Sequence, residues 1–138
     1  MNKQERLNSL YKKYGLSGED VFKSPQGWVI ITRSGIDKIQ ANADITISYD
    51  LLSNSLDNVI IKAIGSMGDN TIETFGESNP KNTRNSYPIA MAEKRAMSRV
   101  VLKLSGFYAE GVFGEDEADD FSKEVKRQKA EKPNLDNL

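Results

Sequence analysis

The basic stretch that precedes residue 104 has residue types and a spacing suited to binding phosphate. Arg95, Arg99 and Lys103 follow one another at intervals of four residues, and Lys94 lies beside the first of them. Because side chains four positions apart share one face of a helix, this spacing predicts a basic row exposed to solvent. Such a row can bind phosphate oxygens, but the same spacing also fits a solvated helix face without a ligand.

A polar loop precedes this row. Residues 79–86, with the sequence NPKNTRNS, contain Lys81 and Arg84 among amide and hydroxyl side chains that can donate hydrogen bonds to phosphate. Tyr87 follows the loop and is the aromatic residue best placed to stack on a base. The predicted DNA-binding residues are Lys81, Arg84, Tyr87, Lys94, Arg95, Arg99 and Lys103.

The composition argues against catalysis. The chain has no cysteine and no histidine, which excludes disulfides, thiolate nucleophiles, structural zinc sites and histidine-based acid–base chemistry. Neither a G-x-x-x-x-G-K-[ST] nor a G-x-G-x-x-G motif is present. Asp69, Glu73 and Glu93 could join Lys62 or Lys94 in a nuclease-like set, yet no spacing singles these residues out. We therefore expect no enzyme, no catalytic residue, no metal and no cofactor.

Charge is unevenly distributed along a chain that is nearly neutral as a whole. The 138 residues include 19 basic and 20 acidic ones, which gives 19 − 20 = −1. Residues 81–103 hold six bases and one acid, a local balance of 6 − 1 = +5, whereas residues 110–120 hold six acids and no base. A partner responds to such local fields more than to the total charge. The pattern predicts a basic binding segment followed by an acidic linker.

The N-terminal third predicts short helices around one short strand. Residues 4–14 place leucines and tyrosines at helical spacing, and Ser17 is expected to cap one further helical turn. The apolar, β-branched segment 27–32 predicts a buried strand that contains Trp28. Ser34 is then expected to cap a second helix, whose apolar residues fall on one side.

The middle of the chain predicts a sheet and a helix that covers it. Three strand patterns joined by short polar turns occupy residues 45–51, 59–64 and 71–75, the last with Phe75 expected in the core. The strongest helical stripe follows, capped by Asn85 or Ser86 and ended by Gly106. The predicted fold class is α+β, with a three-stranded antiparallel β-meander crossed by one long basic helix and preceded by short helices.

Two regions are expected. Residues 1–109 would form an α+β nucleic-acid-binding domain, and residues 110–138 would form an acidic linker and a charged, disordered C-terminal tail. No apolar run approaches about 18 residues, and the N-terminus lacks the apolar core of a signal peptide. We therefore expect no membrane span and a location in the cytoplasm.

Three pieces of the chain carry a family resemblance: GIDKIQANADITISYDLL, VIIKAIGSMGDNTIETFGES and NSYPIAMAEKRAMSRVVLKLSGF. Together they span Ser34 to about Phe107, and they resemble the phage-encoded single-strand annealing proteins of the Rad-fifty-two-like superfamily. In those proteins a short helix leads into a β-meander, and a long basic helix then ends in a Phe/Gly pair. Arg99, Lys103 and Gly106 fall at positions similar to the family's closing K-R-A-L-x-x-x-G motif.

The resemblance implies a function. Such a protein binds single-stranded DNA independently of sequence and anneals complementary strands in phage-type recombination or replication, inside a bacterial host cell. It implies a homo-oligomer, because family members line DNA along a ring or filament, and it implies no nucleotide hydrolysis. For the acidic run 110–120, charge alone suggests two roles: a mimic of DNA that competes for the basic groove, or a docking site for another replication or recombination protein. The alternative is a protein-interaction or regulatory module with no nucleic-acid role.

Overall fold

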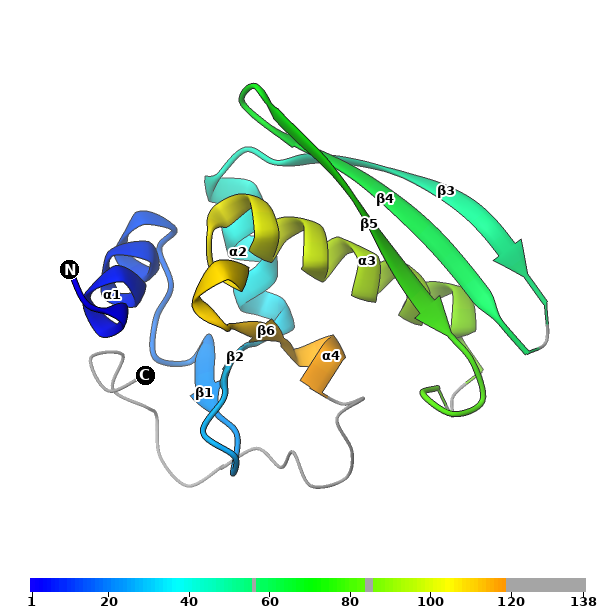
Figure 1. Cartoon of the computed structure of the whole chain (residues 1–138), viewed down its shortest axis with the longest axis horizontal. Helices are drawn as coiled ribbons and strands as arrows, with labels where there is room; N and C mark the ends of the chain where they lie inside the picture. The colour runs from blue at the N-terminus through cyan, green and yellow to red at the C-terminus, as the bar shows by residue number, and fades with distance from the viewer. Residues whose placement is uncertain (56, 84–85, 119–138) are drawn as a thin grey trace.

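A computed structural model describes residues 1–55, 57–83 and 86–118 (Figure 1). In chain order the elements are α1 (Lys3–Lys13), β1 (Val21–Lys23), β2 (Val29–Ile31), α2 (Arg33–Asn42), β3 (Thr46–Asn54), β4 (Val59–Met67), β5 (Asn70–Ser78), α3 (Pro88–Ser105), the 3-10 helix η1 (Tyr108–Glu110), β6 (Phe113–Gly114) and α4 (Glu115–Ala118). Within these ranges no helix has both the length and the apolarity needed to cross a bilayer.

The predicted meander is confirmed. Strands β3, β4 and β5 form one antiparallel sheet in that order, with β4 in the centre. Alternate residues of β4 (Val59, Ile61 and Ala63) are buried and face α3, which lies across β4 and β5 (Figure 1). The fold is therefore α+β, with a three-stranded antiparallel sheet, a long helix packed against it and additional short helices.

Two glycines allow α3 to lie very close to the sheet. A Cβ atom on Gly76 would lie 1.9 Å from the Ala92 carbonyl oxygen, and one on Gly65 would lie 2.1 Å from a methyl carbon of Val100. Side chains at these sheet positions would push the helix away. At Gly76 the clash is with the Ala92 backbone, which cannot rotate aside, and at Gly65 it is with the buried Val100 side chain. Glycine on the strands and alanine on the helix therefore set the distance between the two layers.

A second layer covers the other side of α3. Strand β2 pairs antiparallel with β1 and parallel with β6, so the ends of the described chain meet in one small sheet. In Figure 1 helix α3 runs between this small sheet and the meander. Phe107, just after α3, is fully buried and stacks on Tyr11 of α1 with ring centroids 5.9 Å apart. The core is thus continuous from α1 to the meander.

The expected domain boundary after residue 109 is wrong. Val112 has no exposed surface, and Phe113 and Gly114 pair with Ile30 and Ile31 of β2. The folded unit therefore continues through α4, which the acidic composition of this segment concealed. The remainder of the expected tail, residues 119–138, lies outside the described residues.

The N-terminal third also differs in detail from its prediction. The helical turn expected after Ser17 is instead a turn followed by β1, because the Asp20 carboxylate accepts a hydrogen bond from the Ser17 N–H at 2.8 Å. Helix α2 is capped by Thr32 rather than Ser34, with the Thr32 hydroxyl oxygen accepting from the Gly35 N–H at 3.1 Å. Gly106 ends α3 in the left-handed conformation, as expected, with φ of 95°.

The N-cap residue of α3 is Tyr87, and its side chain makes no capping hydrogen bond. The prediction that Ser86 caps this helix is therefore wrong. The other predicted cap, Asn85, lies outside the described residues.

Strand β3 keeps the predicted alternation but not the predicted burial. Tyr49 and Leu51 lie on the side of the sheet that faces α3, yet they are 38% and 51% exposed. The reason is that α3 lies over β4 and β5, so β3 extends beyond the helix. The apolar side of this edge strand is left uncovered within the described part of the chain.

Candidate nucleic-acid interface

Arg95 is not part of an exposed basic row. Its side chain is 1% exposed, and its guanidinium donates to the Glu77 carbonyl at 3.0 Å, the Thr83 hydroxyl at 2.8 Å and the Asn82 carbonyl at 2.8 Å. These acceptors belong to β5 and the loop that follows it. The prediction that Arg95 faces solvent is therefore wrong: this side chain fixes the loop to α3.

Arg99 is also engaged within the protein. One guanidinium nitrogen donates to the Phe75 carbonyl of β5, and Nε lies 3.3 Å from a carboxylate oxygen of Glu117. Since β5 is an edge strand, the carbonyls of Phe75 and Glu77 would otherwise lack a strand partner. Two residues along a strand and four along a helix both span about 6 Å, so Arg95 and Arg99 match these two carbonyls. The four-residue spacing of Arg95 and Arg99 therefore lets both side chains donate to the open edge of β5.

The acidic run contributes to this internal pairing. The Glu117 and Asp116 side chains are buried, and Asp116 accepts from the Ser98 hydroxyl at 3.3 Å and lies 3.9 Å from an Arg33 nitrogen. Glu110 forms an ion pair with Arg6 at 3.0 Å. These carboxylates are not a free acidic linker, because the fold neutralises them with its own bases. The last two acids of the run lie outside the described residues.

The polar loop uses most of its donors on itself. The Asn79 side-chain oxygen accepts from the Lys81 and Asn82 backbone N–H groups, and the Asn82 side-chain oxygen accepts from the Asn79 N–H at 2.8 Å. The Ser78 hydroxyl donates to Thr83 at 2.8 Å. Only Lys81 of the described loop presents an exposed charged group to solvent, while Arg84 lies outside the described residues.

The remaining predicted residues lie at different points along α3. Tyr87, before its first turn, is 67% exposed, and Lys94 is partly exposed about two turns further on. Lys103 lies in the last turn, exposed, with its ammonium 5.1 Å from the centroid of the Tyr108 ring. The 18 residues of the helix span about 27 Å, so Tyr87 and Lys103 do not form one compact site.

Sequence reasoning missed an aromatic strip next to Lys103. Phe113 packs edge-on against both Trp28 and Tyr108, with centroids 6.1 Å apart in each pair. Trp28 was expected in the core but is 37% exposed, as is Tyr108. Phe75, also expected in the core, is 47% exposed because its side chain is on the sheet face opposite α3. The three rings of the strip, those of Trp28, Tyr108 and Phe113, come from separate segments, so no local sequence pattern could have predicted their contact.

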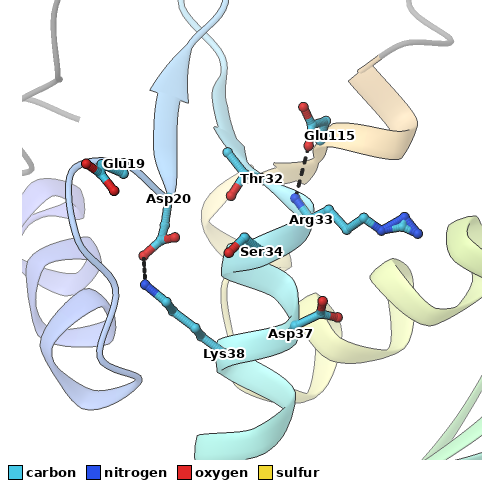
Figure 2. Close-up of a pocket in the computed structure, with 8 residues that line it drawn as sticks. All are labelled: Glu19, Asp20, Thr32, Arg33, Ser34, Asp37, Lys38 and Glu115. Atoms are coloured by element: carbon cyan, nitrogen blue, oxygen red, sulfur yellow. Dashed lines mark hydrogen bonds and ion pairs between the residues drawn. The ribbon is translucent and has the colours of Figure 1, made fainter.

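A shallow pocket of about 620 Å³ lies at the N-terminus of α2 (Figure 2). It contains four carboxylates and two basic side chains, and Figure 2 shows two of the carboxylates already bound: Asp20 to Lys38 at 2.8 Å, and Glu115 to the Arg33 backbone N–H at 3.0 Å. Among the described residues no cluster of acidic side chains is arranged to hold a metal. In this pocket the Glu115 carboxylate therefore caps the N-terminus of α2, and Lys38 holds the Asp20 carboxylate.

Asp20 lies in this pocket with its carboxylate bound to Lys38. Burial by itself would raise the pKa of Asp20, but the ammonium of Lys38 and the backbone N–H of Ser17 outweigh it and hold the pKa below its ordinary value. A lowered pKa means that the charged form stabilises the fold.

We expect Arg95→Met to lower the free energy of unfolding by about 2–4 kcal/mol, because several buried acceptors lose their donor. The matched variant Lys103→Met, at an exposed position of the same helix, should change it by less than about 0.5 kcal/mol. Urea unfolding followed by circular dichroism measures both. A stable Arg95→Met protein would show that the loop contacts of Arg95 contribute little.

We expect Asp20→Asn to lower the melting temperature at about pH 7 and to have a smaller effect in acid. The stabilisation by the Asp20 carboxylate is present above the ordinary pKa of about 3.9 and is lost as pH falls through the lowered value. Thermal unfolding at a series of pH values measures the difference between the two proteins, with the exposed Asp37→Asn as control. A difference that is constant with pH would contradict this assignment.

Comparison of the chain with models of known protein families, with curated proteins and with solved structures finds no match. The resemblance to annealing proteins thus rests on the sequence motifs alone.

Proposed function

We propose that this protein binds single-stranded DNA without sequence preference and anneals complementary strands as a homo-oligomer. One observation supports the proposal: the basic residues of α3 and of the loop before it are of two kinds. Arg95 and Arg99 are bound internally, whereas Lys81, Lys94 and Lys103 form no ion pair within the part of the chain that the structure describes. Exposed ammonium groups of this kind hold phosphates by charge alone.

Backbone contact explains why such binding would not depend on sequence. Lysines that hold phosphates leave the bases free to pair with a second strand, and this step needs no nucleotide hydrolysis or cofactor. The outer face of the meander is an unsuitable surface for DNA, because Lys62 there lies between Asp50 and Glu73 at 3.9 and 3.8 Å and both acids are exposed. The DNA strand is therefore expected at the exposed lysines and not on this face of the sheet.

The uncovered side of β3 supports the oligomer. Tyr49 and Leu51 face the helix side of the sheet, and Leu52, at an irregularity in the strand, is 54% exposed. One protomer offers only a few cations, so tight binding needs several protomers along one strand. A second copy of the chain that covers β3 would supply this linkage. We extend the proposal to phage-type recombination or replication in the bacterial cytoplasm on the resemblance noted above.

The same exposed strand is what favours the alternative function, a protein-interaction or regulatory module with no nucleic-acid role. In that case β3 would bind a different protein, and the lysines would only solvate the surface. The two functions differ in their response to DNA.

We expect a labelled oligothymidine to bind in fluorescence anisotropy, with an affinity that falls as salt rises. If about three lysines contact phosphates, the logarithm of Kd should rise with the logarithm of salt with a slope of about two. Lys94→Glu and Lys103→Glu should each weaken binding, whereas Lys12→Glu on α1 should change it little. Flat anisotropy at low salt would exclude this function, and strand cleavage that requires added magnesium would indicate a nuclease.

We expect the protein to be larger than a monomer in light scattering, and Leu51→Lys to reduce its mass. The matched control is Ser48→Lys, which adds the same charge to the opposite, polar side of the same strand. Equal masses for both variants and the unchanged protein would show that β3 is not the contact between copies. A monomer that binds DNA tightly would contradict the oligomeric part of the proposal.

A further inference from the structure

The strip formed by Trp28, Phe113 and Tyr108 is held by backbone pairing. Strand β6 lies beside β2 (Figure 1), with Phe113 opposite Ile30. The ring of Trp28, just before β2, packs against the Phe113 ring. The Trp28 backbone is fixed at both polar groups, because its carbonyl accepts from the Ser24 N–H at 2.9 Å and its N–H donates to the Ser24 hydroxyl at 3.1 Å. The rings are therefore preorganised.

Positive charge lies at one end of the strip. The ammonium of Lys103 lies 5.1 Å from the centroid of the Tyr108 ring. Two acids lie close in sequence, and both are engaged: Glu110 forms an ion pair with Arg6 at 3.0 Å, and Glu115 accepts from the Arg33 backbone N–H at 3.0 Å. The structure thus places an ammonium group directly against an exposed ring.

Exposed rings beside an ammonium group suit one class of ligand in particular. An apolar protein partner would bury this surface at the cost of removing the Lys103 ammonium from water. A nucleic-acid strand satisfies both features, because its bases stack on aromatic faces while a phosphate pairs with the ammonium group. Tryptophan and tyrosine are sequence-tolerant stacking surfaces, since every base has a π face.

We propose that Trp28 and Tyr108, supported by Phe113, form a base-stacking site for single-stranded nucleic acid, with Lys103 binding a flanking phosphate. This inference rests on the proposed function and specifies where the bases lie. Lys103 belongs both to α3 and to the strip, so a phosphate bound at this lysine would lie beside the rings.

The chain itself supplies the probe. Trp28 is the only tryptophan, so its fluorescence reports on this site without a label. Titration of the full-length protein with unlabelled oligothymidine should quench that fluorescence, with the same Kd as measured by anisotropy. Trp28→Ala should raise this Kd about tenfold or more, and Trp28→Phe should raise it less, because the smaller ring still stacks. Phe75→Ala, which removes a ring that is 47% exposed, against 37% for Trp28, from the outer face of the sheet, is the matched control and should leave Kd unchanged.

The outcomes separate this site from the function. Binding seen by anisotropy with no change in tryptophan fluorescence, or with the same Kd in Trp28→Ala, would overturn the stacking site and leave the proposed function intact. Absence of any binding would overturn the proposed function itself. If Trp28→Ala melts at a lower temperature, fluorescence quenching of the unaltered protein decides the question, since it needs no variant.

Discussion

The distance between α3 and the meander is the constraint on which the other contacts depend. At Gly76 and Gly65 the strands have no side chain; the helix backbone at Ala92 occupies the space at Gly76, and the Val100 side chain occupies the space at Gly65. The Thr74 hydroxyl then reaches the Ala96 carbonyl at 2.7 Å, a contact between side chain and helix backbone that a wider separation would not allow. Only at this distance can the guanidinium groups of α3 reach around the sheet to the carbonyls of β5.

The two kinds of basic residue on α3 do different work because their head groups differ. A guanidinium offers five donors in a plane and loses little hydration when buried, so Arg95 can bind several acceptors of the loop at once. An ammonium is compact and strongly hydrated, and Lys94 and Lys103 keep theirs near the surface. Counting both types as one positive patch overestimates the charge that a ligand meets. The acids of α4 reduce it further, through the Glu117–Arg99 pair.

The sequence predicted the large sheet and α3 well, because Val59, Ile61 and Ala63 alternate and the helical stripe is long. It failed where local pattern carries no information about partners. Strand β6 has two residues, one of them glycine, and its parallel partner β2 is more than eighty residues earlier. The spacing of Arg95, Arg99 and Lys103 showed that they share a helix face, but not that a sheet edge lies beside two of them. The Trp28 ring packs against Phe113 instead of entering the core, and a strand pattern around residue 28 cannot reveal this contact.

The pairing of β2 with β6 also bears on when the protein can fold during synthesis. Chains leave the ribosome from the N-terminus, at roughly 5–20 residues per second. Strand β2 has only β1 beside it until Phe113 and Gly114 emerge, and the first turn of α2 waits equally long for the Glu115 carboxylate that accepts from Arg33. The small sheet is therefore completed last, after the meander and α3 have formed from contacts closer in sequence. Until Phe113 and Gly114 emerge, a nascent chain would leave one edge of the apolar strand Val29–Ile31 without its native partner.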